Sequence, residues 1–182
     1  MSRKIVLVGK SCSGKSTIAK ELEKYGLTAQ ISTTTRPKRD YEKQGIDYHF
    51  ISDAEFDNKN ANGEFIETDS FNNWQYGLTH DDFNKADVLI LTPRGLQKYL
   101  DILPKEKFLI IYIETSIELR CKRIDYRGDK HDDINRRWVA DEIDFMHWEQ
   151  WGALWDMKIS LQSENVIPNL IQILTQNKKI EL

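Results

Sequence analysis

Apolar residues along this chain gather in short runs that are separated by segments with helical spacing. The runs at 88–91 (VLIL) and 108–113 (FLIIYI) are uninterrupted, which is typical of strands covered on both faces. Predicted strands span residues 4–8, 28–32, 87–91, 107–113 and 156–161. Predicted helices span residues 15–25, 94–101, 116–125, 131–150 and 165–177. This alternation predicts a three-layer α/β fold around a central parallel sheet of five strands.

One region interrupts the alternation of strands and helices. Residues 33–78 contain only short strand-like pieces. These pieces lie at residues 48–50, 65–67 and 74–76. The pair Asn72-Asn73 is a turn signal between the last two pieces, so we expect a small inserted mixed sheet.

A short helix is expected directly after this insert. Thr79 is the predicted N-cap of this helix, because Asp82 stands three residues later, at the position of the acid in a capping box. We therefore expect a single domain with an insert at about 33–85. Its core would comprise residues 1–32 and 86–182.

The segment GKSCSGKST at residues 9–17 has the spacing G-x-x-x-x-G-K-S of a phosphate-binding loop (P-loop). It follows a predicted strand and opens a predicted helix, as a P-loop must. The alternative is a glycine turn that contains Lys-Ser by chance, and such a turn would require neither the strand nor the helix. Lys15 would reach the β- and γ-phosphates of a nucleotide, and the Ser16 hydroxyl would ligate Mg²⁺. We interpret Cys12 as a small filler rather than a reactive thiol. The predicted ATP-binding residues are Gly9, Ser11, Cys12, Ser13, Gly14, Lys15, Ser16 and Thr17.

Composition and charge narrow the class of protein. A chain of 182 residues suffices for one α/β domain with a real core. A net charge of −3 argues against a general nucleic-acid binder, which is basic overall. The two cysteines cannot build a disulfide framework, and neither a secretory signal nor an apolar run of membrane-spanning length is present. We therefore expect a cytoplasmic protein with no membrane partner.

A second anion site is indicated by the segment STTTRPKR at residues 32–39. Arg36 and Arg39 stand among hydroxyl residues next to a proline, and guanidinium groups match phosphate oxygens bidentately. Taken alone, the segment is more typical of a solvated basic loop.

The longer segment STTTRPKRDYEKQGIDYHFIS resembles the nucleoside-monophosphate (NMP) binding segment of guanylate kinases. The matching positions are Ser32, Thr34, Thr35, Arg36, Arg39, Glu42, Gly45, Asp47, Tyr48 and Phe50. A second block matches at residues 64–67 (EFIE) and 75–77 (QYG), and the P-loop also fits the family form. The segment at about 120–145 resembles the lid of the family through Arg123, Arg127 and Arg137, and it is one residue shorter than the family pattern. The similarity runs from residue 4 to about 161.

The resemblance implies roles for individual residues. Arg36, Arg39, Tyr48 and Tyr76 would bind the acceptor phosphate, while Ser32 and Glu67 would face the base. A carboxylate suits guanine, which offers two adjacent donors, although Glu67 on a strand could also simply face solvent. The catalytic residues implied are Lys15, Arg36, Arg123, Arg127 and Arg137.

Two departures from the family pattern concern base recognition. The Tyr-Gly pair is normally followed by Ser or Thr, and here Leu78 follows it. The acidic pair at the end of the third core strand is replaced by Ile90 and Thr92. We keep Thr92 among the acceptor-binding residues, and Arg94 is either a new ligand or an exposed residue at a helix start.

The resemblance implies an ATP- and Mg²⁺-dependent NMP kinase that acts on GMP, dGMP or a related nucleotide. Two alternatives are a non-catalytic guanylate kinase-like binding module and a P-loop kinase for another phosphorylated small molecule. The expected partners are small nucleotides and not nucleic acid, and the protein would be a monomer or a homodimer.

Overall fold

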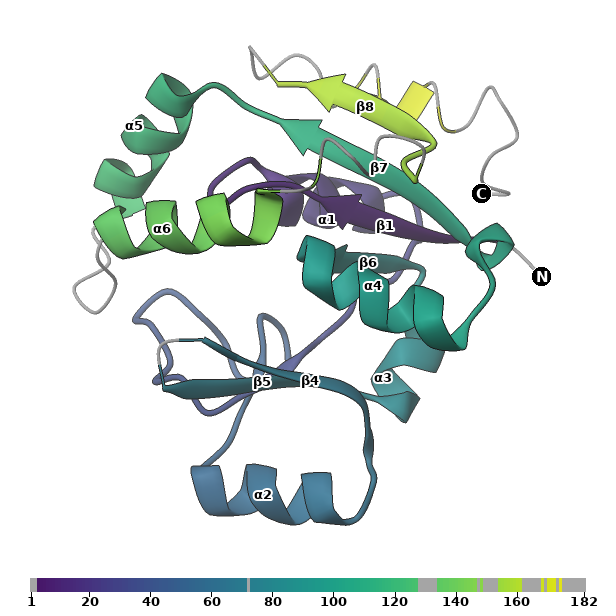
Figure 1. Ribbon diagram of the computed structural model, residues 1–182, viewed down its shortest axis with the longest axis vertical. Helices are drawn as coiled ribbons and strands as arrows, with labels where there is room; N and C mark the ends of the chain where they lie inside the picture. The colour runs from purple at the N-terminus through teal and green to yellow at the C-terminus, as the bar shows by residue number, and fades with distance from the viewer. Residues whose placement is uncertain are drawn as a thin grey trace. The chain divides into compact units, whose positions relative to one another are not determined.

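The computed structural model describes residues 3–71, 73–127, 134–146, 148, 154–161, 168, 170–172 and 174, with the backbone alone at 125–127 and 134–137. The chain forms two compact units. The larger comprises residues 1–27 and 87–182, and the smaller comprises residues 28–86. Each unit is described by itself (Figure 1).

The larger unit is built on a parallel sheet with the strand order β6-β1-β7-β8. The strands are β1 (Lys4–Val8), β6 (Val88–Leu91), β7 (Phe108–Glu114) and β8 (Met157–Ser160). Val6 pairs with Leu89 on one side and with Ile110 on the other, so β1 is central. Strands β1, β6 and β7 carry the uninterrupted apolar runs of the sequence and most of their side chains are buried, whereas β8 alternates half-buried and exposed residues.

The prediction of a fifth core strand at 28–32 was wrong for the described sheet, which has four strands. Residues 28–32 contain one large apolar side chain, Ile31, and they already belong to the smaller unit. The next strand of the chain, β2 (Thr33–Thr34), lies in the other sheet.

Helices cover both faces of the parallel sheet. In Figure 1, α4 (Pro93–Ile102) lies on the near side and α1 (Lys15–Glu23) on the far side. Helix α1 buries Ile18, Ala19 and Leu22, and α4 is capped by the Thr92 hydroxyl. The remaining helices of this unit are the 3-10 turn η1 (Lys105–Lys107), α5 (Ile117–Arg127) and α6 (Ile134–Phe145).

Helix α6 is shorter than the helix predicted at 131–150, and part of that range lies outside the described residues. The chain turns after Phe145, and this turn brings Trp148 into an aromatic cluster. The ring centroid of Trp148 lies 5.8 Å from that of Phe145 and 5.7 Å from that of Tyr112. Of the helix predicted at 165–177, only residues 168, 170–172 and 174 are described, and all are helical.

The smaller unit contains a mixed sheet with the strand order β3-β2-β5-β4. Strand β2 pairs parallel to β3 (His49–Phe50) and antiparallel to β5 (Trp74–Thr79), which also pairs with β4 (Phe65–Phe71). Asn73, between β4 and β5, has a φ of +60°, a conformation that asparagine tolerates well. The small mixed sheet predicted from the sequence is confirmed.

Two helices complete the smaller unit. Helix α3 (His80–Lys85) has the expected cap, because the Thr79 hydroxyl accepts a hydrogen bond from the Asp82 amide. Helix α2 (Asp53–Ala61) was not predicted, although Ser52 and Glu55 form a complete capping box. Its buried Phe56 stacks on Phe65 with ring centroids 4.5 Å apart, which fixes the helix on the sheet.

None of the helices in the described ranges is both long and apolar enough to span a membrane.

Candidate functional site

The P-loop backbone adopts a conformation that its glycines make possible. Cys12 and Gly14 have φ values of +59° and +106°, and the Ser13 amide donates to the Lys10 carbonyl at 3.1 Å. At Gly9, a Cβ atom would lie 2.5 Å from the Ile113 carbonyl oxygen of β7. The loop therefore requires glycine at position 9 because β7 passes so close.

The start of α1 offers donors and no competing acid. Gly14 caps the helix without a side-chain hydrogen bond, and the first turn contains no acidic residue. The hydroxyl of Ser13 is buried and has no hydrogen-bond partner among the described atoms. A buried donor without a partner, beside a helix N-terminus, fits a phosphate group, which supplies acceptors.

Lys15 and Ser16 begin helix α1. The Lys15 ammonium donates to the carbonyls of Gly9 and Lys10, so its side chain spans the mouth of the loop. Ser16 is exposed, and its hydroxyl is an oxygen ligand of the kind that Mg²⁺ prefers. Within the described residues, no group of three or more His, Cys, Asp or Glu side chains could hold a metal ion.

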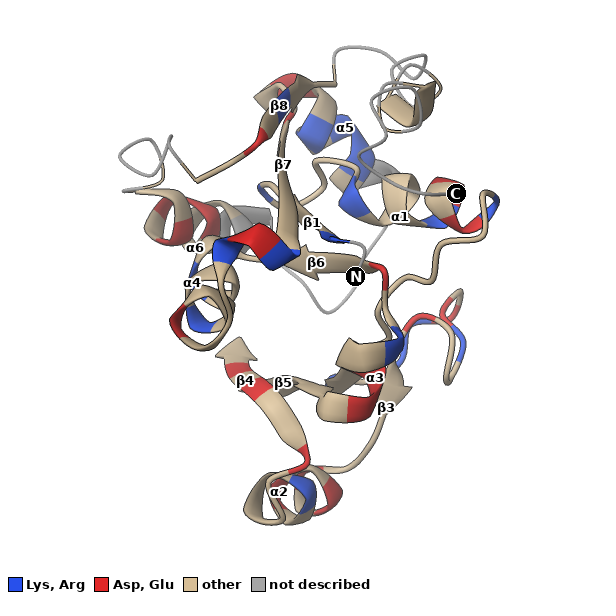
Figure 2. Ribbon diagram, turned by 90° about the vertical axis from the view of Figure 1, so that its right-hand side faces the viewer, with Lys and Arg blue, Asp and Glu red and all other residues tan. Residues whose placement is uncertain are grey.

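The segments around α5 contact the P-loop through its carbonyl groups. Arg123 Nη1 donates to the Cys12 carbonyl at 3.0 Å, and the Thr115 hydroxyl donates to the Ser13 carbonyl at 2.8 Å. Helix α5 carries four basic and two acidic residues, and α6 carries three acidic and two basic residues. Figure 2 shows basic residues on α5 and acidic residues on α6. The side chains of Arg127 and Arg137 lie outside the described atoms.

A cavity of about 620 Å³ lies at the carboxyl ends of β7 and β8, beside the first turn of α5. Its lining residues are Glu114, Thr115, Ser116, Glu118, Leu119, Lys122 and Ser160. Thr115 connects this cavity to the P-loop through its bond to Ser13. Ligands of open parallel sheets bind at this edge, so the cavity is placed for the remainder of a molecule whose phosphates occupy the P-loop.

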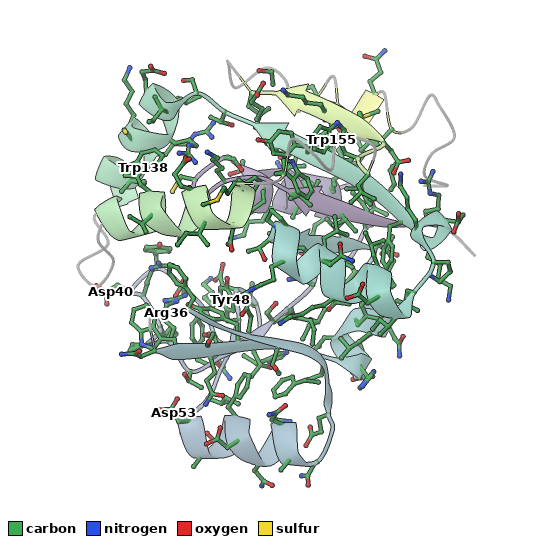
Figure 3. The ribbon with its side chains drawn as sticks, viewed as in Figure 1. Arg36, Asp40, Tyr48, Asp53, Trp138 and Trp155 are labelled. Atoms are coloured by element: carbon green, nitrogen blue, oxygen red, sulfur yellow. The ribbon has the colours of Figure 1, made fainter. Side chains whose placement is uncertain are left out.

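The smaller unit holds the second predicted anion site around Arg36. The Arg36 side chain is 6% exposed, and its guanidinium donates from Nη2 to Glu42 Oε1 at 2.7 Å and from Nη1 to the Pro37 carbonyl at 2.8 Å. It lies 5.4 Å from the ring centroid of Tyr48 and 5.6 Å from that of Phe50. Arg36 and Tyr48 are labelled in Figure 3.

Glu42 connects both arginines of this site. It accepts a hydrogen bond from the Arg39 amide at 2.8 Å and from Arg39 Nη1 at 3.1 Å. Burial alone would raise the pKa of Glu42, but the hydrogen bonds and charges of Arg36 and Arg39 outweigh burial and lower it. The carboxylate therefore stays ionised and holds both guanidinium groups in one place.

Two tyrosines complete this cluster. The rings of Tyr48 and Tyr76 meet edge to face with centroids 6.3 Å apart. Burial raises the pKa of both phenols, so both hydroxyls keep their protons at neutral pH. Arg36, Arg39, Tyr48 and Tyr76 are thus brought together as a set of donors that suits a phosphate monoester.

The guanylate kinase family model matches residues 1–156 of this chain. The chain belongs to the guanylate kinase family. It is 35% identical over 133 residues to a guanylate kinase of Malacoplasma penetrans, with 68% of each chain covered. A guanylate kinase of Symbiobacterium thermophilum is 32% identical over 167 residues, which cover 85% of this chain and 75% of that relative.

The fold is also that of a solved guanylate kinase. The crystal structure of guanylate kinase from Anaplasma phagocytophilum superposes with a TM-score of 0.70 and covers 99% of this chain and 87% of its own. The sequences are 23% identical, so this likeness concerns the fold alone. This likeness over nearly the whole chain indicates that the parallel core sheet and the small mixed sheet both belong to the guanylate kinase fold.

The residues predicted to read the base in this guanylate kinase-family chain lie on or beside the small sheet. Glu67 on β4 is half-buried and pairs across the sheet with Leu78, which is fully buried. The hydroxyl of Thr79 donates to Asp82 Oδ2 at 2.6 Å and caps α3, so we expect that it does not replace the hydroxyl missing at position 78. The hydroxyl of Ser32 accepts from Gln30 Nε2 at 2.9 Å.

Thr92 and Arg94 belong to the larger unit, whereas the cluster around Arg36 is made of residues of the smaller unit. The Thr92 hydroxyl accepts the Gly95 amide at 3.0 Å and caps α4. Arg94 is exposed in the first turn of that helix. A capping role accounts for Thr92 at this strand end, and its role in acceptor binding stays a prediction.

Two buried acids contact the site residues directly, and neither of them was assigned a role from the sequence. Glu42 belongs to the quoted motif, and its spacing of three from Arg39 is the signal that could have identified the pair. Asp141 is 6% exposed and accepts hydrogen bonds from Ser11 of the P-loop. It carries no local signal, because its partner lies 130 residues away.

Proposed function

We propose that this protein transfers the γ-phosphoryl group of ATP to the 5′-phosphate of GMP and of dGMP. The observation that carries the proposal is the cluster of Arg36, Arg39, Tyr48 and Tyr76 in a chain of the guanylate kinase family that also has a complete P-loop. A binding module without activity would have no need of Lys15 and Ser16. The cytoplasmic location and the monomeric or dimeric state expected from the sequence stay predictions.

The donor phosphates would bind in the P-loop. The amides at the start of α1 and the Ser13 hydroxyl would donate to the β-phosphate, and Lys15 would leave the Gly9 and Lys10 carbonyls to reach the γ-phosphate. When bound at Ser16, Mg²⁺ supplies positive charge to the β- and γ-phosphate oxygens. The nucleoside would extend toward the cavity beside Thr115.

The acceptor phosphate would bind to Arg36 and Arg39, which Glu42 holds in place. An oxygen of this phosphate attacks the γ-phosphorus of ATP, the bond from that phosphorus to the β–γ bridging oxygen breaks, and ADP leaves with the electron pair. The attacking oxygen is already ionised, so no general base is required. Arg123, Arg127 and Arg137 would stabilise the charge on the transferred group, a role worth on the order of a thousandfold.

Base selection would rest on Glu67 and Ser32. A carboxylate accepts from the N1–H and 2-amino groups of guanine, and adenine lacks this pair of donors. Leu78 supplies no hydroxyl, so Glu67 carries more of the discrimination in this chain than it would beside a serine.

The test compares Glu67→Gln with Glu64→Gln in steady-state assays with GMP and AMP. Glu64 lies just before β4 and pairs with Lys59 at the surface, so it controls for the loss of an acid nearby. We expect Glu67→Gln to lower kcat/KM for GMP by at least tenfold, about 1.4 kcal/mol, and Glu64→Gln to leave it within twofold. Equal values for wild type and Glu67→Gln would remove Glu67 from the base site.

A further inference from the structure

Two consecutive acids of helix α6 accept hydrogen bonds from two consecutive residues of the P-loop, Lys10 and Ser11. Asp141 Oδ1 accepts from the Ser11 amide and from the Ser11 hydroxyl, each at 2.9 Å, and Oδ2 accepts the same amide at 3.1 Å. Glu142 Oε1 accepts from Lys10 Nζ at 2.7 Å. The first contact is buried and the second is exposed, because the Glu142 side chain is 70% exposed.

The buried contact extends to α5. Arg120 Nη1 donates to Asp141 Oδ2 at 2.8 Å, and the two side chains are 4% and 8% exposed. The guanidinium of Arg120 lies 4.1 Å from the ring centroid of Trp138, which is labelled on α6 in Figure 3. One carboxylate therefore joins the P-loop, α5 and α6. Losing either charge would leave the other buried without its counter-ion.

These contacts use both donors of Ser11. Its amide and hydroxyl are directed at Asp141, so Ser11 anchors a helix pair in this structure, although the sequence predicted it as an ATP ligand. One turn after Arg120, Arg123 reaches the next residue of the P-loop, where it donates to the Cys12 carbonyl. The position of Arg123 over the P-loop thus depends on how α5 is fastened to it.

We propose that Asp141 is a positioning residue for phosphoryl transfer, which acts through Ser11 and Arg120 to hold α5 and its arginine Arg123 over the donor phosphates. This inference rests on the proposed function, since it assigns Asp141 a part in that reaction. The contact is made wholly within the larger unit, so its loss affects the ATP side of the reaction and leaves the Arg36 cluster unchanged. The exposed pair Lys10–Glu142 makes no comparable contribution, because exposed ion pairs are weak.

The experiment compares Asp141→Asn, Ser11→Ala and the double variant with Glu142→Gln as the matched control. Asparagine keeps the size of the side chain and one acceptor for Ser11, but it loses the charge that pairs with Arg120. We expect Asp141→Asn to lower kcat at least tenfold and to raise KM for ATP at least threefold, with KM for GMP within twofold of wild type. Ser11→Ala should change the same parameters in the same direction, and Glu142→Gln should change none.

The double variant separates a shared pathway from two independent defects. Because Asp141 acts through Ser11, the double variant should lose no more activity than Asp141→Asn does alone. Asp141→Glu, which keeps the charge, should recover part of the loss in kcat. Two independent defects, which multiply in the double variant, would overturn the proposal.

Titration calorimetry with ATP provides a readout that does not require turnover. Weaker ATP binding by Asp141→Asn supports the positioning role even if wild type phosphorylates no acceptor, an outcome that would refute the proposed function separately. Tighter ATP binding would instead mean that the carboxylate competes with the donor phosphates. That result, or equal changes in KM for ATP and GMP, would overturn the proposal. If Asp141→Asn does not fold, Ser11→Ala decides by the same criteria.

Discussion

Arg36 and Glu42 form a buried ion pair in which Nη2 and Oε1 lie 2.7 Å apart and each side chain is at most 6% exposed. Glu42 also accepts from the backbone and the side chain of Arg39, so a single carboxylate orders both arginines predicted to bind the acceptor phosphate. Ordering the arginines before the acceptor arrives reduces the entropy that binding must overcome.

Glu42→Gln should therefore damage both stability and acceptor binding. Removing one partner of a buried pair leaves the other charge uncompensated, and we expect a loss of about 3 kcal/mol in the free energy of unfolding. KM for GMP should rise about tenfold, or 1.4 kcal/mol, while KM for ATP stays unchanged. Urea unfolding and steady-state kinetics measure the two effects.

Asp81→Asn is the matched control for Glu42→Gln. Asp81 pairs with Lys85 at 2.6 Å on the exposed face of α3, in the same unit as Glu42. Its loss should cost at most about 0.5 kcal/mol and leave KM for GMP unchanged. If Asp81→Asn and Glu42→Gln were equally stable, the buried pair would contribute no more to stability than an exposed pair does.

Acid should remove the contribution of Glu42. Its pKa is lowered in the folded protein, so its stabilisation is complete above the unfolded-state pKa, about 4.3, and is lost as the pH falls through the folded-state pKa. The difference in stability between wild type and Glu42→Gln should be constant from about pH 6 to pH 8 and shrink below about pH 4. Thermal melting across this range measures it, and a difference that grows toward low pH would have the wrong sign.

Gly9→Ala should abolish ATP binding or prevent folding. A Cβ at this position would lie 2.5 Å from the Ile113 carbonyl and 2.7 Å from the Ser13 hydroxyl, so the P-loop or β7 must move. Gly95→Ala in α4 is the control, because its nearest neighbour would be 3.4 Å away and alanine favours the helix by up to about 1 kcal/mol. Calorimetric titration with ATP compares them, and normal binding by Gly9→Ala would contradict the tight packing of the loop against β7.

Thr79→Ala distinguishes a helix cap from a base reader. The Thr79 hydroxyl accepts the Asp82 amide at 3.1 Å, and losing such a cap costs about 1 kcal/mol. We expect the variant to be less stable by this amount and to keep its KM for GMP within twofold. A tenfold rise in KM for GMP at unchanged stability would mean that Thr79 replaces the hydroxyl that Leu78 lacks.

Local patterns explain which parts of the fold could be predicted. The cores of β1, β6 and β7 are uninterrupted apolar runs, whereas β8 alternates apolar and polar residues, and the sequence located all four strands within a residue or two. Helix α2 was missed because it buries only Phe56, so its apolar pattern is weak although its capping box is complete. The strand expected at 28–32 is not part of either described sheet, because Ile31 is its only large apolar side chain and a buried parallel strand needs several.

The candidate site divides in the same way. The P-loop and the Arg36 segment are each one continuous stretch of sequence, so residue types and spacing predicted their chemistry. The contact of Asp141 with Ser11 joins residues 130 positions apart, and nothing near Asp141 in the sequence marks it. The capping roles of Thr79 and Thr92 likewise became clear only when the ends of α3 and α4 were known.

The most direct test of the proposed function is to incubate the protein with ATP, Mg²⁺ and one nucleoside monophosphate at a time, and to identify the products by mass. We expect diphosphates from GMP and dGMP, none from AMP, CMP or UMP, and none from any of them with Lys15→Met. Conversion of AMP at a rate equal to that of GMP would contradict the role of Glu67. The absence of any diphosphate from a protein that still binds ATP would contradict the proposed kinase activity itself.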